Sequence, residues 1–391
     1  MNAGRRLWLM AALTAATIAG GAALAWLLNP YGATSSRLIN PIFRRIKYDR
    51  LGTPYLLRAA RPETVLVGSS RVQIGMRIEQ GERDGVLNAA IQAATIAQLE
   101  EIIDVALLNP RLKRIVWGVD FFAFNSIWDA RDPNFDARIA DRPRARIEDT
   151  LLSLDALGDG FDMLKLALRG RARLRPIVAT PVPWPRALIC REYVIERNDG
   201  LDQSPPAPIA AQLDQMIHLY DPYTFSPLTL ARFRRVVAKI RARKVDLILF
   251  VPPMSEYELE LIRQTGDWGR FERFKRALAA TSPFIDFAAY NAMAPRDEFY
   301  LQVIHFKPDA GFQILRLMLG MPATACGADA RAVSASAIAV TAGNIEETLA
   351  RERRMRDEAV SSPSRYSSAV GAALRGLRAA RRLRLMNGGD L

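Results

Sequence analysis

Two widely separated residues in this sequence have the chemistry of a serine nucleophile and its base. The stretch ETVLVGSSRVQIG, residues 63–75, passes from an apolar run into two serines, the second of which is Ser70. His305 lies much later, in FYLQVIHFKPDAG. A serine hydroxyl becomes a useful nucleophile when an imidazole accepts its proton. The alternatives are a simple turn at the serines, since Gly and Ser are ordinary turn residues, and a histidine buried in the core.

Other reactive side chains are scarce, which limits the chemistry. The histidines are His218 and His305, and the cysteines are Cys190 and Cys326. These numbers exclude a thiolate zinc cluster, a histidine-rich metal site and a disulfide scaffold, although one disulfide can form. No phosphate-loop or dinucleotide motif follows the first apolar run, and no carboxylates cluster. We therefore predict no cofactor and no metal.

Apolar runs and amphipathic stretches alternate along the chain and indicate the elements that position the site. Strand-like runs cover residues 64–68, 114–119, 245–251 and 284–287. Helix-like stretches cover residues 95–108, 224–244 and 255–280. Buried strands alternating with helices favour a parallel sheet covered on both faces. The predicted fold class is α/β, with a doubly wound parallel sheet in three α/β/α layers, flavodoxin-like in type.

Several strand ends carry polar or small residues, where parallel sheets place their sites. Asn88 follows a short apolar run in VLNAAIQAAT, and Gly118 and Asp120 close the run in IVWGVDFFAF. Together with Gly68-x-Ser70 and the late His305, this order resembles the SGNH (GDSL-like) hydrolase superfamily over most of residues 60–320. Each motif is short, and their shared order is what carries the resemblance.

A wider pattern resembles a group of membrane-anchored bacterial SGNH-like proteins associated with surface-polysaccharide production. It consists of NPY after an apolar span, VLVGSSR, NAAI, GVDFFAFN, VPPMSEYELELIRQTGDWGRFERFKRAL and IDFAAYN. The resemblance implies that Ser70 is the nucleophile and His305 the base. It also implies that the backbone N–H of Ser70, with Ala89 or Ala90, forms an oxyanion hole, with Asn88 as a further donor or a turn residue.

The sequence departs from the superfamily pattern at two positions. Gln302 stands where the late Asp-x-x-His block has its orienting aspartate, and Asp120 stands where the third block has asparagine. Glutamine can fix the imidazole tautomer but cannot stabilise an imidazolium, and the equivalent amide in a protease triad costs about 10⁴ in kcat. A carboxylate at position 120 would repel an oxyanion. Nearby acids that can replace the missing carboxylate are Asp286, Asp297 and Glu298.

Arg71 and Gly118 complete the predicted substrate contacts. Arg71 is either a solvated charge or a ligand for an acidic sugar or an acyl carboxylate. His218, in QMIHLYDPY, is more typical of a loop or interface residue.

The N-terminus is typical of an uncleaved signal anchor over residues 1–28. Residues 7–28 carry no charge and follow two arginines; as a helix they would rise roughly 33 Å, enough to cross a bilayer. A cleaved signal peptide is the alternative, with Ala23-Leu24-Ala25 as its site. Basic residues between 37 and 47 argue for a cytoplasmic main domain, whereas the resemblance implies a periplasmic one. We expect a single-pass protein of the bacterial inner membrane with its main domain in the periplasm.

After the anchor, the sequence predicts a basic connector over 29–60. An α/β domain follows over 61–326, with a helical insertion at about 125–222. The chain then continues as a basic, partly helical or disordered tail over 327–391. The formal net charge of +13 favours anionic partners. The tail is either a solvated appendage or a contact for a membrane surface or polyanion. Nucleic acid is discounted, because no recognition motif supports it.

Two functions follow from these residues. The first is an acyl-ester hydrolase or O-acyltransferase that acts on a cell-envelope or extracellular polysaccharide and an acyl donor. The second is a catalytically weak or inactive scaffold that binds polysaccharide or a secretion-complex partner. The distance between Ser70 Oγ and the nearer His305 ring nitrogen discriminates between them, since the enzyme requires about 4 Å or less.

Overall fold

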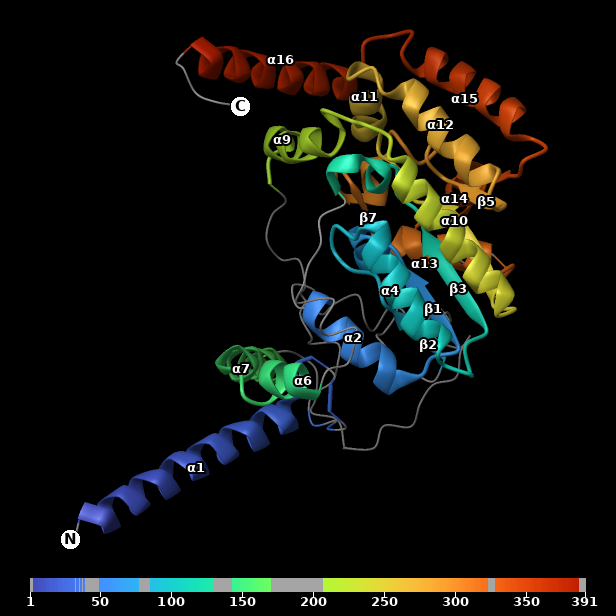
Figure 1. Ribbon diagram of the computed structural model, residues 1–391. Coiled ribbons are helices and arrows are strands. Elements are labelled where there is room, and N and C mark those ends of the chain that lie inside the picture. Colours follow the sequence, from blue (N-terminus) through green and yellow to red (C-terminus); the bar gives the residue numbers. More distant parts are fainter. Residues whose placement is uncertain are drawn as a thin grey trace.

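The computed structural model describes residues 3–31, 33, 34, 36, 38, 49–76, 85–128, 143–169, 207–322 and 328–386. Cys190, Cys326 and residues 39–48 of the basic connector lie outside these residues. The main body is an α/β fold built on a six-stranded sheet, and one long helix extends from it at the N-terminus (Figure 1).

The predicted apolar runs form the strands of this sheet. They are β1 (Thr64–Val67), β2 (Val86–Asn88), β3 (Arg114–Gly118), β4 (Asp246–Val251) and β5 (Phe284–Asp286), and the sixth is β8 (Ile338–Val340). The order is β2-β1-β3-β4-β5-β8, with the first five strands parallel and β8 antiparallel to β5. The chain reverses its direction of progress between β1 and β3, and sites in such sheets lie beyond the strand ends at this point.

Alternate residues of the strands face two separate apolar cores. Val65 and Trp117 belong to one cluster, whereas their neighbours Leu66 and Val116 belong to the other. The first cluster includes residues of α4 (Ile96–Leu107), α10 (Pro227–Ala242), α11 (Glu256–Gln264) and α12 (Trp268–Ala279). The second includes residues of α3 (Ser70–Gly75), α13 (Pro308–Met318) and α14 (Ala330–Ser336). Helices therefore cover both faces of the sheet, as the continuous apolar strands predict.

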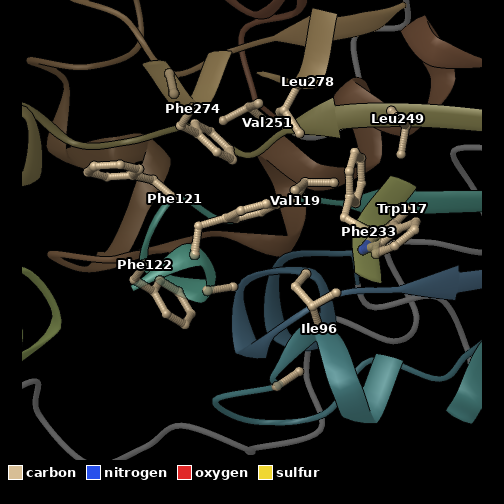
Figure 2. Close-up of a cluster of buried hydrophobic side chains, with 14 of the residues drawn as sticks. Ile96, Trp117, Val119, Phe121, Phe122, Phe233, Leu249, Val251, Phe274 and Leu278 are labelled. Carbon is tan, nitrogen blue, oxygen red and sulfur yellow. The ribbon is translucent and has the colours of Figure 1, made fainter. Parts of the chain in front are cut away.

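Aromatic side chains fill the larger core beside the carboxyl ends of β3 and β4 (Figure 2). Trp117 packs on Phe233 of α10 with ring centroids 5.0 Å apart. Phe121, beyond the end of β3, packs on Tyr223 at 4.2 Å and on Phe274 of α12 at 5.5 Å. The short helices η3 (Phe122–Phe124) and η4 (Ser126–Trp128) follow Phe121. This packing holds the segment that follows β3 against the helices α10 and α12, on one face of the sheet.

The sheet continues past the domain boundary predicted at residue 326. β8 pairs with β5, and α15 (Ile345–Ala359) packs on α12 while α16 (Arg365–Met386) packs on α11 and on α9 (Ile209–Tyr220). The buried Lys275 of α12 forms ion pairs with Asp286 at 2.8 Å and with Glu352 of α15 at 2.7 Å. The boundary was predicted too early, because a three-residue strand in an Ala-, Ser- and Arg-rich stretch gives no recognisable periodicity.

The N-terminal helix α1 (Ala3–Leu28) is long and apolar enough to cross a membrane, judged by length and composition. Of the predicted insertion, the structure describes α6 (Pro143–Thr150), α7 (Leu154–Arg169) and the segment from residue 207 onward. α7 packs on α1, and Figure 1 shows α6 and α7 beside the end of α1. The helix α2 (Asp49–Ala60) packs on α4.

Candidate active site

Ser70 is the first residue of α3, directly beyond the end of β1. Gly68 makes the sharp turn with a φ of 153°, a value that residues with side chains rarely adopt. Ser69 is the N-cap, and its hydroxyl oxygen accepts a hydrogen bond from the Arg71 N–H at 3.2 Å. The strand and its capped helix thus place Ser70 at the rim of the sheet, as the Gly-Ser-Ser stretch predicts.

His305 lies on a small hairpin formed by β6 (Tyr300–Gln302) and β7 (His305–Phe306), in which Gln302 pairs with His305. Both polar groups of the Val303 backbone at its tip are held by side chains. The Val303 N–H donates to Gln212 Oε1 of α9 at 2.8 Å, and Ser255 Oγ donates to the Val303 carbonyl at 2.5 Å. The hairpin is therefore fixed from two helices.

Ser70, His305 and Gln302 form a continuous hydrogen-bonded row. Ser70 Oγ lies 2.9 Å from His305 Nε2, and His305 Nδ1 lies 2.9 Å from Gln302 Oε1. An amide oxygen only accepts hydrogen bonds, so Nδ1 carries the proton and the lone pair of Nε2 faces the serine hydroxyl. This is the nucleophile–base–orienting-group arrangement of a serine hydrolase, with an amide in the third position.

The histidine is held in its neutral form. Burial, reinforced by the positive charge of Arg71, lowers the pKa of His305 from 6.5 to about 4. A neutral imidazole can accept the Ser70 proton, but the same environment makes the resulting imidazolium costly. The amide of Gln302 orients the ring without offsetting that cost.

Close backbone approaches hold the serine helix against the histidine hairpin. A Cβ on Gly75 of α3 would overlap the Phe306 ring, and a Cβ on Gly311 of α13 would overlap the Gly75 carbonyl oxygen. Phe306 is fully buried and directly follows His305. Because these glycines let α3, β7 and α13 touch, they set the separation between Ser70 and His305.

Arg71 is not the solvated or substrate-binding charge that the sequence predicted. Its side chain is fully buried and forms ion pairs with Asp120, at 3.1 Å, and with Glu258 of α11. Tyr220 of α9 donates a hydrogen bond to the same Glu258. Burial raises the pKa of both carboxyls against the opposing effect of Arg71. The Arg71 cluster, defined as these four residues, ties α3 to α9, α11 and the segment after β3.

Asp120 and Gly118 have structural partners rather than the predicted substrate contacts. Besides its ion pair with Arg71, Asp120 accepts hydrogen bonds from Ser69, so its carboxyl group is bound to the turn that precedes Ser70. A Cβ on Gly118 would overlap the Val72 side chain, so this glycine makes room for α3. The sequence placed both residues at the correct strand end but could not show which way they point.

The second turn does not supply the oxyanion donors predicted there. Asn88 Nδ2 donates to the carbonyls of Val72 and Met76 at 3.1 and 3.0 Å, which closes the C-terminal end of α3. The Ala89 N–H donates to the Leu66 carbonyl, and the Ala90 N–H donates to Asn88 Oδ1. These groups are used by the fold. The Ser70 N–H, at the first position of a helix, has no partner within that helix.

The acids suggested as replacements for the orienting carboxylate lie elsewhere. Each forms an ion pair with a basic residue: Asp286 with Lys275, Asp297 with Arg365, and Glu298 with Arg296. His218 is exposed on α9. Sequence reasoning missed Glu258, Tyr220 and Gln212 as supporting residues, although the capped helix start at Ser255 was recognisable and points to the segment that carries Glu258.

Comparison with protein-family models finds no match for this chain, and comparison with curated proteins finds none. The relation to SGNH hydrolases therefore stays a prediction, based on the residues quoted above.

Proposed function

We propose that this protein is an SGNH-like serine acyl-ester hydrolase or O-acyltransferase. The observation that carries the proposal is the hydrogen-bonded row of Ser70, His305 and Gln302, with both distances at 2.9 Å. A serine at a capped helix start, in contact with the unprotonated nitrogen of a neutral imidazole, is arranged for nucleophilic attack on a carbonyl.

In the proposed reaction, Ser70 Oγ attacks the ester carbonyl while its proton passes to His305 Nε2. The alcohol departs with that proton, which leaves an acyl group on Ser70. Water or a sugar hydroxyl then attacks the acyl group, gives its proton to Nε2, and the proton returns to Ser70 Oγ. The Ser70 N–H faces the oxyanion as one donor, because the first N–H groups of a helix lack intrahelical partners.

The cellular setting belongs to the same proposal. The helix α1 serves as a single-pass signal anchor in a bacterial inner membrane, with the α/β domain on the periplasmic side. The acyl group is then transferred to or removed from a cell-envelope or extracellular polysaccharide. The length and composition of α1 support the anchor, and the resemblance supports the polysaccharide.

A scaffold without catalysis is the second candidate, and a specific observation favours it. His305 Nδ1 faces the amide of Gln302, and the positive charge of the buried Arg71 opposes protonation of the ring, so neither neighbour stabilises the imidazolium formed during attack. A protein of this kind binds acylated polysaccharide at the same row of residues without turning it over.

Labelling with a fluorophosphonate serine probe separates these functions. We expect the full-length protein in detergent to be labelled, Ser70→Ala to lose labelling, and the control Ser361→Ala, at an exposed serine, to label as the wild type does. Absence of wild-type labelling, or equal labelling of Ser70→Ala, would contradict the enzyme. If labelling is Ser70-dependent, release of acetate from an acetylated polysaccharide, followed by NMR, tests the substrate class.

A further inference from the structure

The helix α7 carries an apolar stripe that no part of the described chain covers. Leu154, Phe161 and Leu168 are 84%, 43% and 67% exposed. They lie seven residues apart, so they share one side of a helix. Acidic residues such as Asp155 and Asp162 lie on a different side. Soluble proteins seldom leave large apolar residues aligned in this way.

The other edge of the apolar face of α7, away from the exposed stripe, packs on α1. Ala156, Gly160 and Met163 of α7 are buried, and a Cβ on Gly160 would lie 2.8 Å from Leu28 of α1. Tyr31, just after α1, donates a hydrogen bond to Asp159 Oδ2 at 2.7 Å. Small residues at such a crossing allow close helix contact, as they do between helices in membranes.

These contacts fix the depth of α7 relative to a bilayer crossed by α1. A Cβ on Gly21 would lie 3.5 Å from Leu157 Cδ1, so α7 reaches back along the last two turns of the apolar run. Two turns correspond to a rise of about 10 Å. Amphipathic helices at membrane surfaces bury their apolar face by about 5–10 Å. The exposed stripe therefore lies at the depth of the boundary between headgroups and acyl chains.

The sequence that follows also fits a lipid surface. Four arginines alternate with other residues in RGRARLR, residues 169–175, directly after the last exposed leucine of the stripe. Basic residues beside an apolar helix face attract anionic lipid headgroups.

From these observations we propose that α7 is an interfacial membrane helix. Its stripe of Leu154, Phe161 and Leu168 inserts into the outer part of the bilayer that α1 crosses. The protein then contacts the membrane through two elements packed on each other, which fixes the tilt of α7 relative to the membrane plane. This inference rests on the proposed membrane anchor, so the experiment tests α1 and α7 separately.

Spin labels on full-length protein in liposomes of phosphatidylglycerol and phosphatidylethanolamine provide the test. In a background of Cys190→Ser and Cys326→Ser, single labels are placed by Phe161→Cys on the stripe, Asp155→Cys as the polar-side control, and Leu13→Cys in α1. Oxygen partitions into lipid, whereas a nickel chelate stays in water. We expect the labels at 161 and 13 to collide preferentially with oxygen and the label at 155 with the nickel chelate.

Each other outcome overturns a defined part of the proposal. Lipid exposure at position 13 with water exposure at position 161 removes the interfacial helix and leaves the anchor. A label at 161 that is shielded from both reagents means that protein, either a second copy or a partner, covers the stripe instead. Water exposure at position 13 removes the anchor itself, and the inference about α7 falls with it.

Discussion

At the scale of single residues, the burial of His305 near the positive charge of Arg71 sets how the candidate site responds to pH. His305 must be neutral to accept the Ser70 proton, and its pKa is lowered to about 4. We therefore expect kcat/KM for p-nitrophenyl acetate to stay constant from pH 8 down to about pH 5 and to fall to half near pH 4. A histidine with its ordinary pKa would lose half its activity near pH 6.5. Circular dichroism at each pH checks that the fold persists. Loss of half the activity near pH 6.5 would contradict the expectation.

Gln302→Glu changes only the charge of the group that faces Nδ1. A carboxylate favours the charged imidazole and therefore raises the pKa of His305. The pH below which activity is lost then moves upward. It also stabilises the imidazolium of the transition state, and we expect kcat/KM at pH 8 to rise by roughly tenfold or more, since the reverse change costs about 10⁴ in a protease triad.

Gln302→Ala serves as the control, because it removes the orienting oxygen and should lower activity below the wild-type value. If Gln302→Glu changed neither the pH dependence nor the rate, charge at position 302 would have no effect on His305. If Gln302→Ala kept the wild-type activity, Gln302 would have no orienting role. Both functional candidates should gain activity from the glutamate, so the activity of the wild type, measured against Ser70→Ala, is what separates them.

At the scale of elements, the site depends on how closely α3, β7 and α13 approach one another. In Gly75→Ala, the new methyl group meets the Phe306 ring and pushes the hairpin away from Ser70. We expect fluorophosphonate labelling of Ser70 to fall by at least tenfold and the melting temperature to drop, because overpacking costs about 1–3 kcal/mol.

Two further variants make this test specific. Adding Phe306→Leu to Gly75→Ala gives the methyl group room and should restore part of the labelling. Gly269→Ala, in α12, places its methyl group in open space and should leave labelling unchanged. Equal loss of labelling in both alanine variants would show that the Gly75 contact does not position the pair.

The elements also show how much of the fold and the candidate site could be predicted from the sequence. The strands with continuous apolar runs were predicted within a residue or two at each end. The spacing of Gln302 and His305 matched the late Asp-x-x-His block, but the short hairpin that carries both was not predicted. The Arg71 cluster could not be predicted, because its members come from four separate segments and a charged residue after a turn is usually solvated. The roles of Asn88 and Gly118 were mistaken because they depend on side-chain direction, which periodicity does not encode.

At the scale of the whole molecule, the two ends of the chain have different relations to the α/β fold. Figure 1 shows α1 projecting from one end, while α16 lies at the other end against α9 and α11. The basic helix α16 and the apolar helix α1 thus lie on different parts of the molecule. The part of the tail before α16 belongs to the fold itself.

Two truncations test whether the tail is an appendage or part of the domain. Ending the chain after residue 336 removes β8, α15 and α16, so β5 becomes an edge strand and the buried Lys275 keeps only its pair with Asp286. The variant loses the pairing of β8 with β5 and the packing of α15 and α16 on the domain, so we expect it to melt far below the full chain in the same detergent. Ending after residue 378 removes only the last turns of α16 and should leave the melting temperature within about 2 °C, a change that corresponds to less than about 1 kcal/mol. If both truncated proteins melted with the full chain, the tail would be an appendage and the contacts of β8 and α15 would contribute nothing to the stability of the sheet.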